Sequence, residues 1–295
     1  MLKYFKNIIR KIILFPLHLF NELSILYSRL LSIIDPNGSE SYWEELSQSQ
    51  IDKKINSKLR ILNTPQHQSK KFDLRKKINF YTPTKIASYR AKTLLSKEID
   101  TLEWIDEFGS KDSIFFDIGA NMGVYSLYYA TYHGGKVFAF EPSIRNLDLL
   151  IRNINLNKLN ELISVVSNPI YNKESMNFFS QKYIKAGEAV SIYGEKKMKN
   201  NYKTLSLTLD YLVKKEIILT PNLIKIDVDG NESEVLQGAT EIIQSVNCKT
   251  ILIETRETTS DNVTKILEKF NYNEKTYKQK KDNINNQIWV KSEFK

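Results

Sequence analysis

The sequence predicts an α/β protein with a doubly wound, mostly parallel sheet, preceded by an N-terminal helical extension. Short apolar runs alternate with segments of helical spacing, and these runs lack polar alternation. Strands that are buried on both faces have this character. Regular alternation of strand and helix is typical of a parallel sheet with right-handed crossovers. A length of 295 residues and a hydrophobic fraction of 41% allow a sizeable core.

Five apolar runs are the expected strands of this sheet. They span residues 113–118, 136–141, 162–166, 223–227 and 249–253. The expected helices between and after them are 123–133, 144–157, 231–246 and 261–270. Upstream, Ile78, Phe80 and Tyr81 indicate a short strand, and 86–108 is mostly helical in pattern. Two more strand candidates, 272–279 and 287–291, flank an Asn-rich turn near the end.

The chain divides by composition into an extension at 1–71 and a catalytic domain at 72–295. Residues 1–112 carry 19 Lys+Arg against 13 Asp+Glu, so most of the formal charge of +9 lies before the expected sheet. An Asp-Pro-Asn-Gly-Ser sequence at 35–39 marks a break, and a polar linker follows it. A basic segment suits either nucleic acid or anionic lipid, and solvated helices are the simpler interpretation.

Residues 1–34 combine basic side chains with the most apolar stretch of the chain. Its charge-free run is interrupted by Pro16 and ends at Glu22, whereas a spanning helix needs about 20 apolar residues. The pattern predicts a helix lying on a membrane surface, and a helix packed on the protein itself is the alternative. The single cysteine, Cys248, fits a reducing cytosol. We therefore expect a cytoplasmic protein with peripheral membrane contact.

A glycine-containing turn directly after the first buried strand is the strongest local feature. Residues 116–123 read Phe-Asp-Ile-Gly-Ala-Asn-Met-Gly and open a helix. Such a turn lets the backbone approach a ligand at the carboxyl end of the strand. The expected cofactor-binding residues here are Asp117, Gly119, Ala120, Asn121 and Gly123.

The charge at this turn favours one class of ligand. The dinucleotide fingerprint G-x-G-x-x-G is incomplete, since only Gly119 and Gly123 are present. The Asp117 carboxylate beside a pyrophosphate would cost about 1–4 kcal/mol at 4 Å. The same carboxylate suits S-adenosylmethionine, which has an ammonium, a sulfonium and no phosphate. Glu141 and Pro142 close the next strand, where ribose hydroxyls need an acceptor.

These motifs, in this order, resemble the FkbM-type methyltransferases. The similar segments are 115–126, 138–142, 223–232, 235–239 and 251–254, so the resemblance covers roughly residues 81–291. The sequence departs from the family where Asp229-Gly230-Asn231-Glu232 replaces a Glu-Gly-Ala-Glu pattern, although both acids are kept. The resemblance implies a class I methyltransferase sheet with an antiparallel final strand. It also implies methyl transfer to oxygen, often on sugars or other small polar metabolites.

Two acids are the expected catalytic residues. Asp227 ends the fourth strand and is expected to face the same crevice as Asp117, with Glu232 second. A hydroxyl acceptor must lose a proton, and a positioned base contributes about 10²–10⁴-fold. These two acids, together with Asp229 and Glu254, could instead hold Mg²⁺, although we favour a site without metal. His133 is expected to cap a helix.

The sequence therefore predicts an S-adenosylmethionine-dependent O-methyltransferase acting on a hydroxyl of a sugar, glycan or other small polar metabolite. The stretch 168–200 is long and polar, and is expected to form an acceptor lid or a solvated insertion. An NAD-dependent oxidoreductase or epimerase is the alternative on the same fold, and an inactive methyltransferase fold is another. No nucleic-acid partner is expected, because the catalytic domain has no basic run with interleaved aromatics.

Overall fold

The computed structural model describes residues 59–62, 77–275 and 284–294. They belong to one compact unit, Lys58–Lys295. The helix expected at 1–34 lies outside the described residues, as does most of the extension at 1–71. Among the described residues, no helix combines the length and apolar character needed to cross a bilayer.

A seven-stranded sheet is the centre of the fold, with strand order β11-β12-β10-β9-β3-β4-β5. Five strands are mutually parallel: β3 (Ile114–Ile118), β4 (Lys136–Phe140), β5 (Ile163–Val166), β9 (Leu223–Ile226) and β10 (Thr250–Arg256). The strand β12 (Ile284–Lys291) runs antiparallel to β10, and β11 (Tyr272–Lys275) runs antiparallel to β12. The predicted fold class, including the antiparallel final strand, is confirmed.

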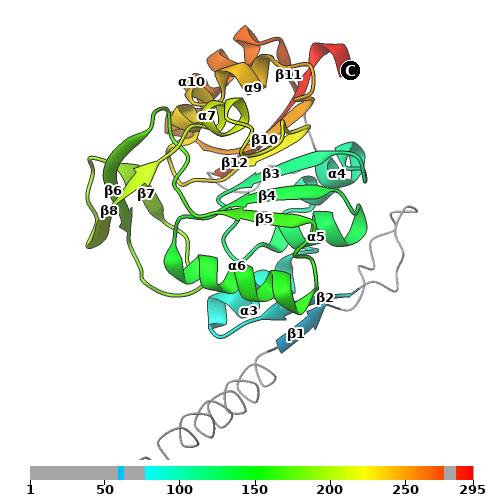
Figure 1. Ribbon diagram of the computed structural model, residues 1–295, viewed down its shortest axis with the longest axis vertical. Helices are drawn as coiled ribbons and strands as arrows, with labels where there is room; N and C mark the ends of the chain where they lie inside the picture. The colour runs from blue at the N-terminus through cyan, green and yellow to red at the C-terminus, as the bar shows by residue number, and fades with distance from the viewer. Residues whose placement is uncertain (1–58, 63–76, 276–283, 295) are drawn as a thin grey trace, which may run out of the picture. The chain divides into compact units, whose positions relative to one another are not determined.

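Helices cover both faces of this sheet (Figure 1). One layer holds α3 (Lys85–Thr93), α4 (Ile99–Phe108), α5 (Val124–Tyr132) and α6 (Ile144–Leu156). The other holds α7 (Leu209–Lys214), α8 (Glu232–Gln237), α9 (Thr240–Gln244) and α10 (Glu257–Lys269). A short 3₁₀ helix, η1 (Ser292–Phe294), follows β12. Each layer encloses its own apolar core against the sheet.

Side-chain alternation along the strands decides which residues face which layer. Phe115 packs in the core beneath α3–α6, whereas Phe116 packs in the core beneath α7–α10. Leu223 and Leu252 likewise face the α3–α6 layer. Since side chains of a strand alternate between faces, every second residue after these points to that same layer. The polar side chains two positions further along these strands therefore lie on the same face of the sheet: Asp117, Lys225 and Glu254.

Two predicted segments differ from the structure. The helical segment 231–246 is two helices, α8 and α9, separated at Gly238, where an added Cβ would lie 2.1 Å from the carbonyl oxygen of Tyr171. The stretch 168–200, expected as an acceptor lid or a solvated insertion, contains strands that the sequence did not indicate. It contributes to a three-stranded antiparallel sheet of β6 (Ser175–Gln181), β7 (Ser191–Gly194) and β8 (Asn200–Ser206), ordered β7-β6-β8.

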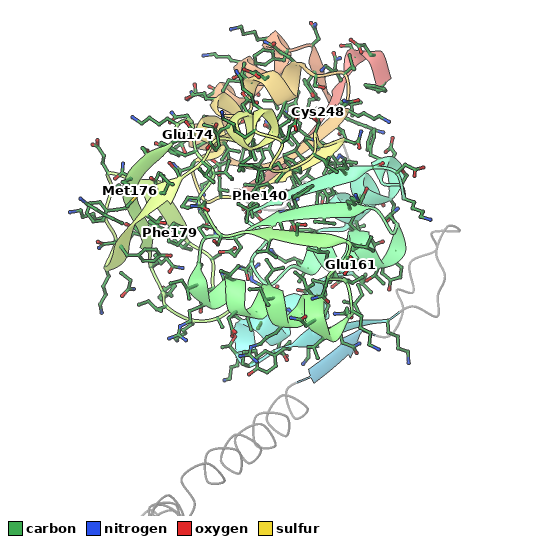
Figure 2. All side chains as sticks on the ribbon, in the orientation of Figure 1. Phe140, Glu161, Glu174, Met176, Phe179 and Cys248 are labelled. Atoms are coloured by element: carbon green, nitrogen blue, oxygen red, sulfur yellow. The ribbon has the colours of Figure 1, made fainter. Side chains whose placement is uncertain are left out.

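The small sheet presents different residues to its two sides (Figure 2). Phe179 of β6 is 2% exposed, whereas Met176 of the same strand is 62% exposed. A further hairpin pairs β1 (Leu59–Leu62) with β2 (Ile78–Tyr81). The backbone N–H groups of Asn79 and Tyr81 in β2 donate to the side chains of Asn157 and Asn153. These bonds attach β2 to the C-terminal end of α6. Cys248 is buried and unpaired, as expected, and burial raises the pKa of its thiol to about 11.

The turn between β3 and α5 needs glycine at its first position. Gly119 has φ of +84°, and an added Cβ would lie 1.9 Å from the carbonyl oxygen of Asp227. Gly134 also has a positive φ, +72°, but its nearest neighbour would be 4.0 Å away. A side chain at either Gly119 or Gly134 would therefore strain the backbone conformation. Only at Gly119 would it also clash with neighbouring backbone.

We expect Gly134→Ala to lower the free energy of unfolding by about 1–2 kcal/mol, the penalty of the left-handed conformation. Gly119→Ala should lower it by more than about 3 kcal/mol, because β9 must also move away from β3. Urea denaturation of both variants measures the difference. Equal losses would contradict the close approach of this turn to Asp227.

Candidate active site

A cavity of about 640 Å³ lies at the carboxyl ends of four neighbouring parallel strands. The ends of β3, β4, β9 and β10 contribute Ile118, Glu141, Asp227 and Glu254 to its lining. The helices α3 and α4 and the segment 188–193 contribute other walls. Ligands of doubly wound proteins bind at this edge of the sheet. The volume is within the usual range for small-molecule sites, about 300–1,000 Å³.

Backbone hydrogen bonds hold the glycine turn against the next strand. The N–H groups of Gly119 and Ala120 both donate to the carbonyl of Phe140, at 2.9 and 3.0 Å. The N–H of Asn121 donates to Oε2 of Glu141 at 2.8 Å. Asn121 has a φ of 52°, which its short polar side chain tolerates, and its buried Oδ1 has no hydrogen-bond partner among the described residues. The turn is therefore rigid and leaves one acceptor free.

Glu141 is held in place by the backbone on both of its oxygens. Its Oε1 accepts from the N–H of Ser143 at 2.8 Å, while Oε2 accepts from Asn121. The side chain is buried, and burial raises the pKa of this carboxyl to about 7 even though these hydrogen bonds oppose the shift. Pro142 also lines the cavity, and its carbonyl accepts from the hydroxyl of Tyr202 at 3.0 Å.

The structure separates the seven expected cofactor-binding residues into two groups. Gly119, Asn121, Glu141 and Pro142 line the cavity. Asp117, Ala120 and Gly123 are not among the lining residues. Gly123 instead begins α5 in the left-handed conformation, with φ of 82°. His133 ends that helix, as the sequence indicated.

Asp117 lies beneath the turn rather than in the cavity. It is 1% exposed, and its Oδ2 accepts from both the N–H and the hydroxyl of Ser126, at 3.1 and 2.5 Å. Burial raises the pKa of this carboxyl, and no group in the part of the chain that the structure describes donates a hydrogen bond to its Oδ1. Asp117 therefore attaches β3 to α5, and other carboxylates supply the negative charge of the cavity.

Lys225 is a fully buried cation at the centre of these acids. Its side chain is 2% exposed, and its Nζ lies 2.9 Å from Oδ2 of Asp227. In the parallel pairing of β3 and β9, Lys225 stands directly opposite Asp117. The Nζ also lies 5.0 Å from the ring centroid of Tyr125, at cation–π distance. Although burial opposes the charge, Asp227 and Asp117 raise the pKa of this ammonium, so it stays protonated.

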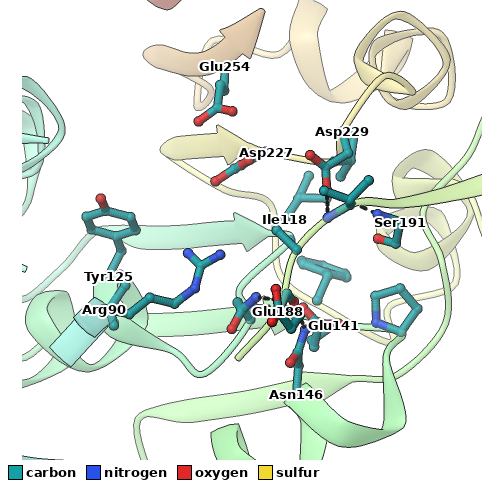
Figure 3. Close-up of a pocket in the computed structure, with 18 of the residues that line it drawn as sticks. Arg90, Ile118, Tyr125, Glu141, Asn146, Glu188, Ser191, Asp227, Asp229 and Glu254 are labelled. Carbon is teal, nitrogen blue, oxygen red and sulfur yellow. Dashed lines mark hydrogen bonds between the residues drawn. The ribbon is translucent and has the colours of Figure 1, made fainter. Parts of the chain in front are cut away.

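The two acids at the ends of β9 and β10 respond to this cation differently. Burial alone would raise the pKa of Asp227, but the charge of Lys225 and its hydrogen bond lower it. The charge of Asp227, together with burial, raises the pKa of Glu254 to about 8. Figure 3 shows both carboxylates at the same side of the cavity. One acid of the pair is thus ionised at neutral pH, and the other retains a proton.

Glu232, the second expected catalytic residue, points elsewhere. It is buried at the start of α8, its Oε1 accepts from the N–H of Gly230 at 2.7 Å, and it does not line the cavity. Asp229 does line it. Its Oδ2 accepts from the N–H groups of Val190 and Ser191, at 2.7 and 3.2 Å, and its Oδ1 lies 3.1 Å from Nη2 of Arg256.

The segment 186–193 forms a wall of the cavity through many polar contacts. The side chains of Asn121 and Asn146 both donate to the carbonyl of Glu188 at 3.0 Å. The Nε of Arg90 donates to the carbonyl of Gly187 at 2.7 Å. Contacts from α3, α6 and the β3–α5 turn therefore hold the segment that the sequence indicated as a lid.

Sequence reasoning missed three lining residues from α3–α5: Arg90, Glu98 and Tyr125. The hydroxyl of Tyr125 donates to Oε2 of Glu98 at 2.5 Å. Figure 3 shows Arg90 and Tyr125 on the opposite side of the cavity from Asp229. Tyr125 belongs to the motif 115–126 that carries the family resemblance. Its position directly after the glycine turn could therefore have predicted that it lines the cavity. Arg90 and Glu98 belong to no motif.

A metal site is not formed by the described residues. No three His, Cys, Asp or Glu side chains among 59–62, 77–275 and 284–294 are arranged to hold an ion. Asp227, which would be central to such a site, already has the Lys225 ammonium at hydrogen-bond distance.

The chain is similar to known methyltransferases. Residues 117–277, more than half of the chain, match the methyltransferase FkbM domain. The hexuronic acid methyltransferase AglP of Haloferax volcanii is 30% identical over 173 residues, which are 59% of this chain and 69% of that protein. The FkbM methyltransferase structure from Methylobacillus flagellatus is 15% identical with a TM-score of 0.46, and the match covers 70% of this chain and 55% of that one. The precorrin-6y C5,15-methyltransferase structure from Geobacter metallireducens is 16% identical with a TM-score of 0.43, and the match covers 68% of this chain and 92% of that one.

A doubly wound sheet with its cavity at the glycine turn is a Rossmann-like fold. The match over residues 117–277 places the chain in the FkbM methyltransferase family. It is an enzyme of the methyltransferase class, and the family implies S-adenosylmethionine as the methyl donor.

Lys225→Met should lower the free energy of unfolding by about 3–5 kcal/mol, because it leaves buried carboxylates without a counter-charge. Lys214→Met is the matched control: its Nζ lies 3.7 Å from Glu241, both side chains are exposed by 71% and 66%, and surface pairs contribute about 0–1 kcal/mol. Thermal and urea unfolding of both variants tests the difference. Similar small losses in the two variants would contradict the role given to Lys225.

Proposed function

We propose that this enzyme transfers a methyl group from S-adenosylmethionine to an oxygen of a sugar, glycan or other small polar metabolite. The observation that carries the proposal is an acid-rich cavity at the glycine turn. Seven carboxylates and three basic side chains from the described residues line it. Such a cavity attracts a ligand with an ammonium and a sulfonium and repels a pyrophosphate. The same charge disfavours the NAD-dependent alternative.

The residues present fit this donor. Glu141 offers fixed carboxylate oxygens where ribose hydroxyls can donate, and the free Oδ1 of Asn121 is an additional acceptor. Gly119 leaves room for close approach to the backbone. We assign Asp227 to the donor's positive charge, since Lys225 keeps its carboxylate ionised. Asp117, Ala120 and Gly123 would act indirectly by shaping the turn.

The donor supplies an electrophilic methyl group on a sulfonium. The chain holds the reactants in the cavity, and alignment of reacting atoms supplies a large share of such rate accelerations. The segment 188–193 excludes water from one side of the cavity. Arg90 and Arg256 line this space and could pair with an acidic acceptor. The similarity to a hexuronic acid methyltransferase supports a sugar or sugar acid as the acceptor class.

Binding of the donor should depend on Glu141. Glu141→Ala should weaken S-adenosylmethionine and S-adenosylhomocysteine alike, by about 10- to 100-fold, because both contain the ribose and a hydrogen bond to a charged group contributes about 1.5–3 kcal/mol. Glu161→Ala is the control, since this exposed glutamate precedes β5 and does not line the cavity (Figure 2). Calorimetry measures both affinities. Tight NAD binding with no affinity for S-adenosylhomocysteine would overturn the proposed donor.

The acceptor class can be tested by transfer of a labelled methyl group from S-adenosylmethionine. Neutral hexoses, hexuronic acids and oligosaccharides that contain them are the substrates to compare. We expect label in at least one sugar, and Arg90→Gln should reduce transfer to the uronic acids more than transfer to the neutral sugars. Label in none of these sugars, with normal donor binding, would contradict the sugar assignment.

A further inference from the structure

The carboxylates of Asp227 and Glu254 leave the sheet side by side but have different surroundings. Ile253 of β10 pairs with Ile226 of β9, so the next residue of each strand projects to the same face. Both line the cavity. Oδ2 of Asp227 is bonded to Lys225, whereas the carboxylate of Glu254 forms no hydrogen bond with any described residue.

Three other carboxylates that line the cavity accept hydrogen bonds from described residues. Glu141 accepts backbone hydrogen bonds on both oxygens, and Glu98 accepts the hydroxyl of Tyr125. Asp229 is held by two backbone N–H groups and by Arg256. Glu254 is half-buried and lines the same cavity. Unlike these three groups, its carboxylate accepts no hydrogen bond from the part of the chain that the structure describes.

We propose that Glu254 is the residue that carries a proton through the catalytic cycle: it holds this proton in the free enzyme, releases it when the cationic donor binds, and then accepts the hydroxyl proton of the acceptor. This inference rests on the proposed function. The charges that act most strongly on the Glu254 carboxyl are those of Asp227, Lys225, Glu98 and Lys97. The ammonium of Lys225 already pairs with Asp227, so a second negative charge beside that pair is disfavoured until another cation enters.

The donor is that cation. S-adenosylmethionine carries one more positive charge than S-adenosylhomocysteine, because its sulfur is a sulfonium. A positive charge near an acid favours the ionised form of the acid. The free enzyme is poised for this change, since the charge of Asp227, together with burial, raises the pKa of Glu254 to about 8. Donor binding then lowers this pKa, and the product, which lacks the extra charge, does not.

The proton balance closes over one turnover. Binding of the donor sends the Glu254 proton to solvent. The acceptor oxygen then forms a bond to the methyl carbon as the carbon–sulfur bond breaks and its electron pair stays on sulfur. The hydroxyl proton passes to Glu254. The products are a methyl ether and S-adenosylhomocysteine, and they leave behind a protonated Glu254, so each turnover releases one proton.

Calorimetric titrations at pH 7.5 in two buffers of different ionisation enthalpy count this proton. For the parent enzyme we expect S-adenosylmethionine to release most of one proton more than S-adenosylhomocysteine does. The difference should vanish in Glu254→Gln and persist in Glu188→Gln, which makes the same substitution in another lining glutamate. Protonation of the ligand's own amino group is present in every variant and does not create this pattern.

The pH dependence of affinity provides a second readout. Because a proton must leave, affinity for S-adenosylmethionine relative to S-adenosylhomocysteine should rise about 10-fold from pH 6.5 to 8.5, and this rise should be absent in Glu254→Gln.

A proton release that survives Glu254→Gln but disappears in Glu141→Gln would assign the proton to Glu141 and overturn the inference. Equal release with both ligands would also overturn it. Failure of the parent enzyme to bind either ligand would instead contradict the proposed donor, which keeps the two outcomes distinct.

Discussion

A buried ammonium in the middle of the sheet determines the electrostatics of this enzyme. Lys225 lies on β9 with its Nζ 2.9 Å from Asp227 and stands opposite Asp117 on β3. Burying a charge is tolerated when it is paired, and here one cation faces several acids. The pairing keeps Asp227 ionised and leaves Glu254 with a raised pKa. The residues that stabilise this part of the sheet therefore also set the charge of the cavity.

The second constraint is the way the cavity wall is attached. Three side chains bond to the backbone of the segment 187–191. Asp229 accepts from the N–H of Val190, Asn146 accepts from the N–H of Gly187, and Asn121 donates to the carbonyl of Glu188. Side chains from the β9–α8 turn, the β3–α5 turn and α6 thus position one wall relative to the strand ends. Asp229 holds this wall, and Glu232 holds the β9–α8 turn itself. Polar residues of the β3–α5 and β9–α8 turns therefore both stabilise the fold and determine the shape of the cavity.

Most of the sheet was predictable, because buried parallel strands are apolar runs of the correct length. The small sheet β6–β8 was not, since a strand such as β6, with Ser, Asn and Gln among its aromatics, gives no such run. The site was predictable where a motif carried it, as for Gly119 and Glu141. The burial of Asp117 and the opposite pKa shifts of Asp227 and Glu254 depend on which residues stand opposite one another on neighbouring strands. The sequence alone does not give this register.

If Lys225 keeps Asp227 ionised, Glu254 is the acid that holds a proton in the free enzyme. Carbon-13 NMR titration of labelled glutamate carboxyl groups is the direct test. One glutamate resonance should titrate with a raised pKa of about 8 and be lost in Glu254→Gln. Its titration should shift to lower pH with S-adenosylmethionine but not with S-adenosylhomocysteine. A Glu254 resonance that titrates at the ordinary value of about 4.3 would contradict this assignment of the proton.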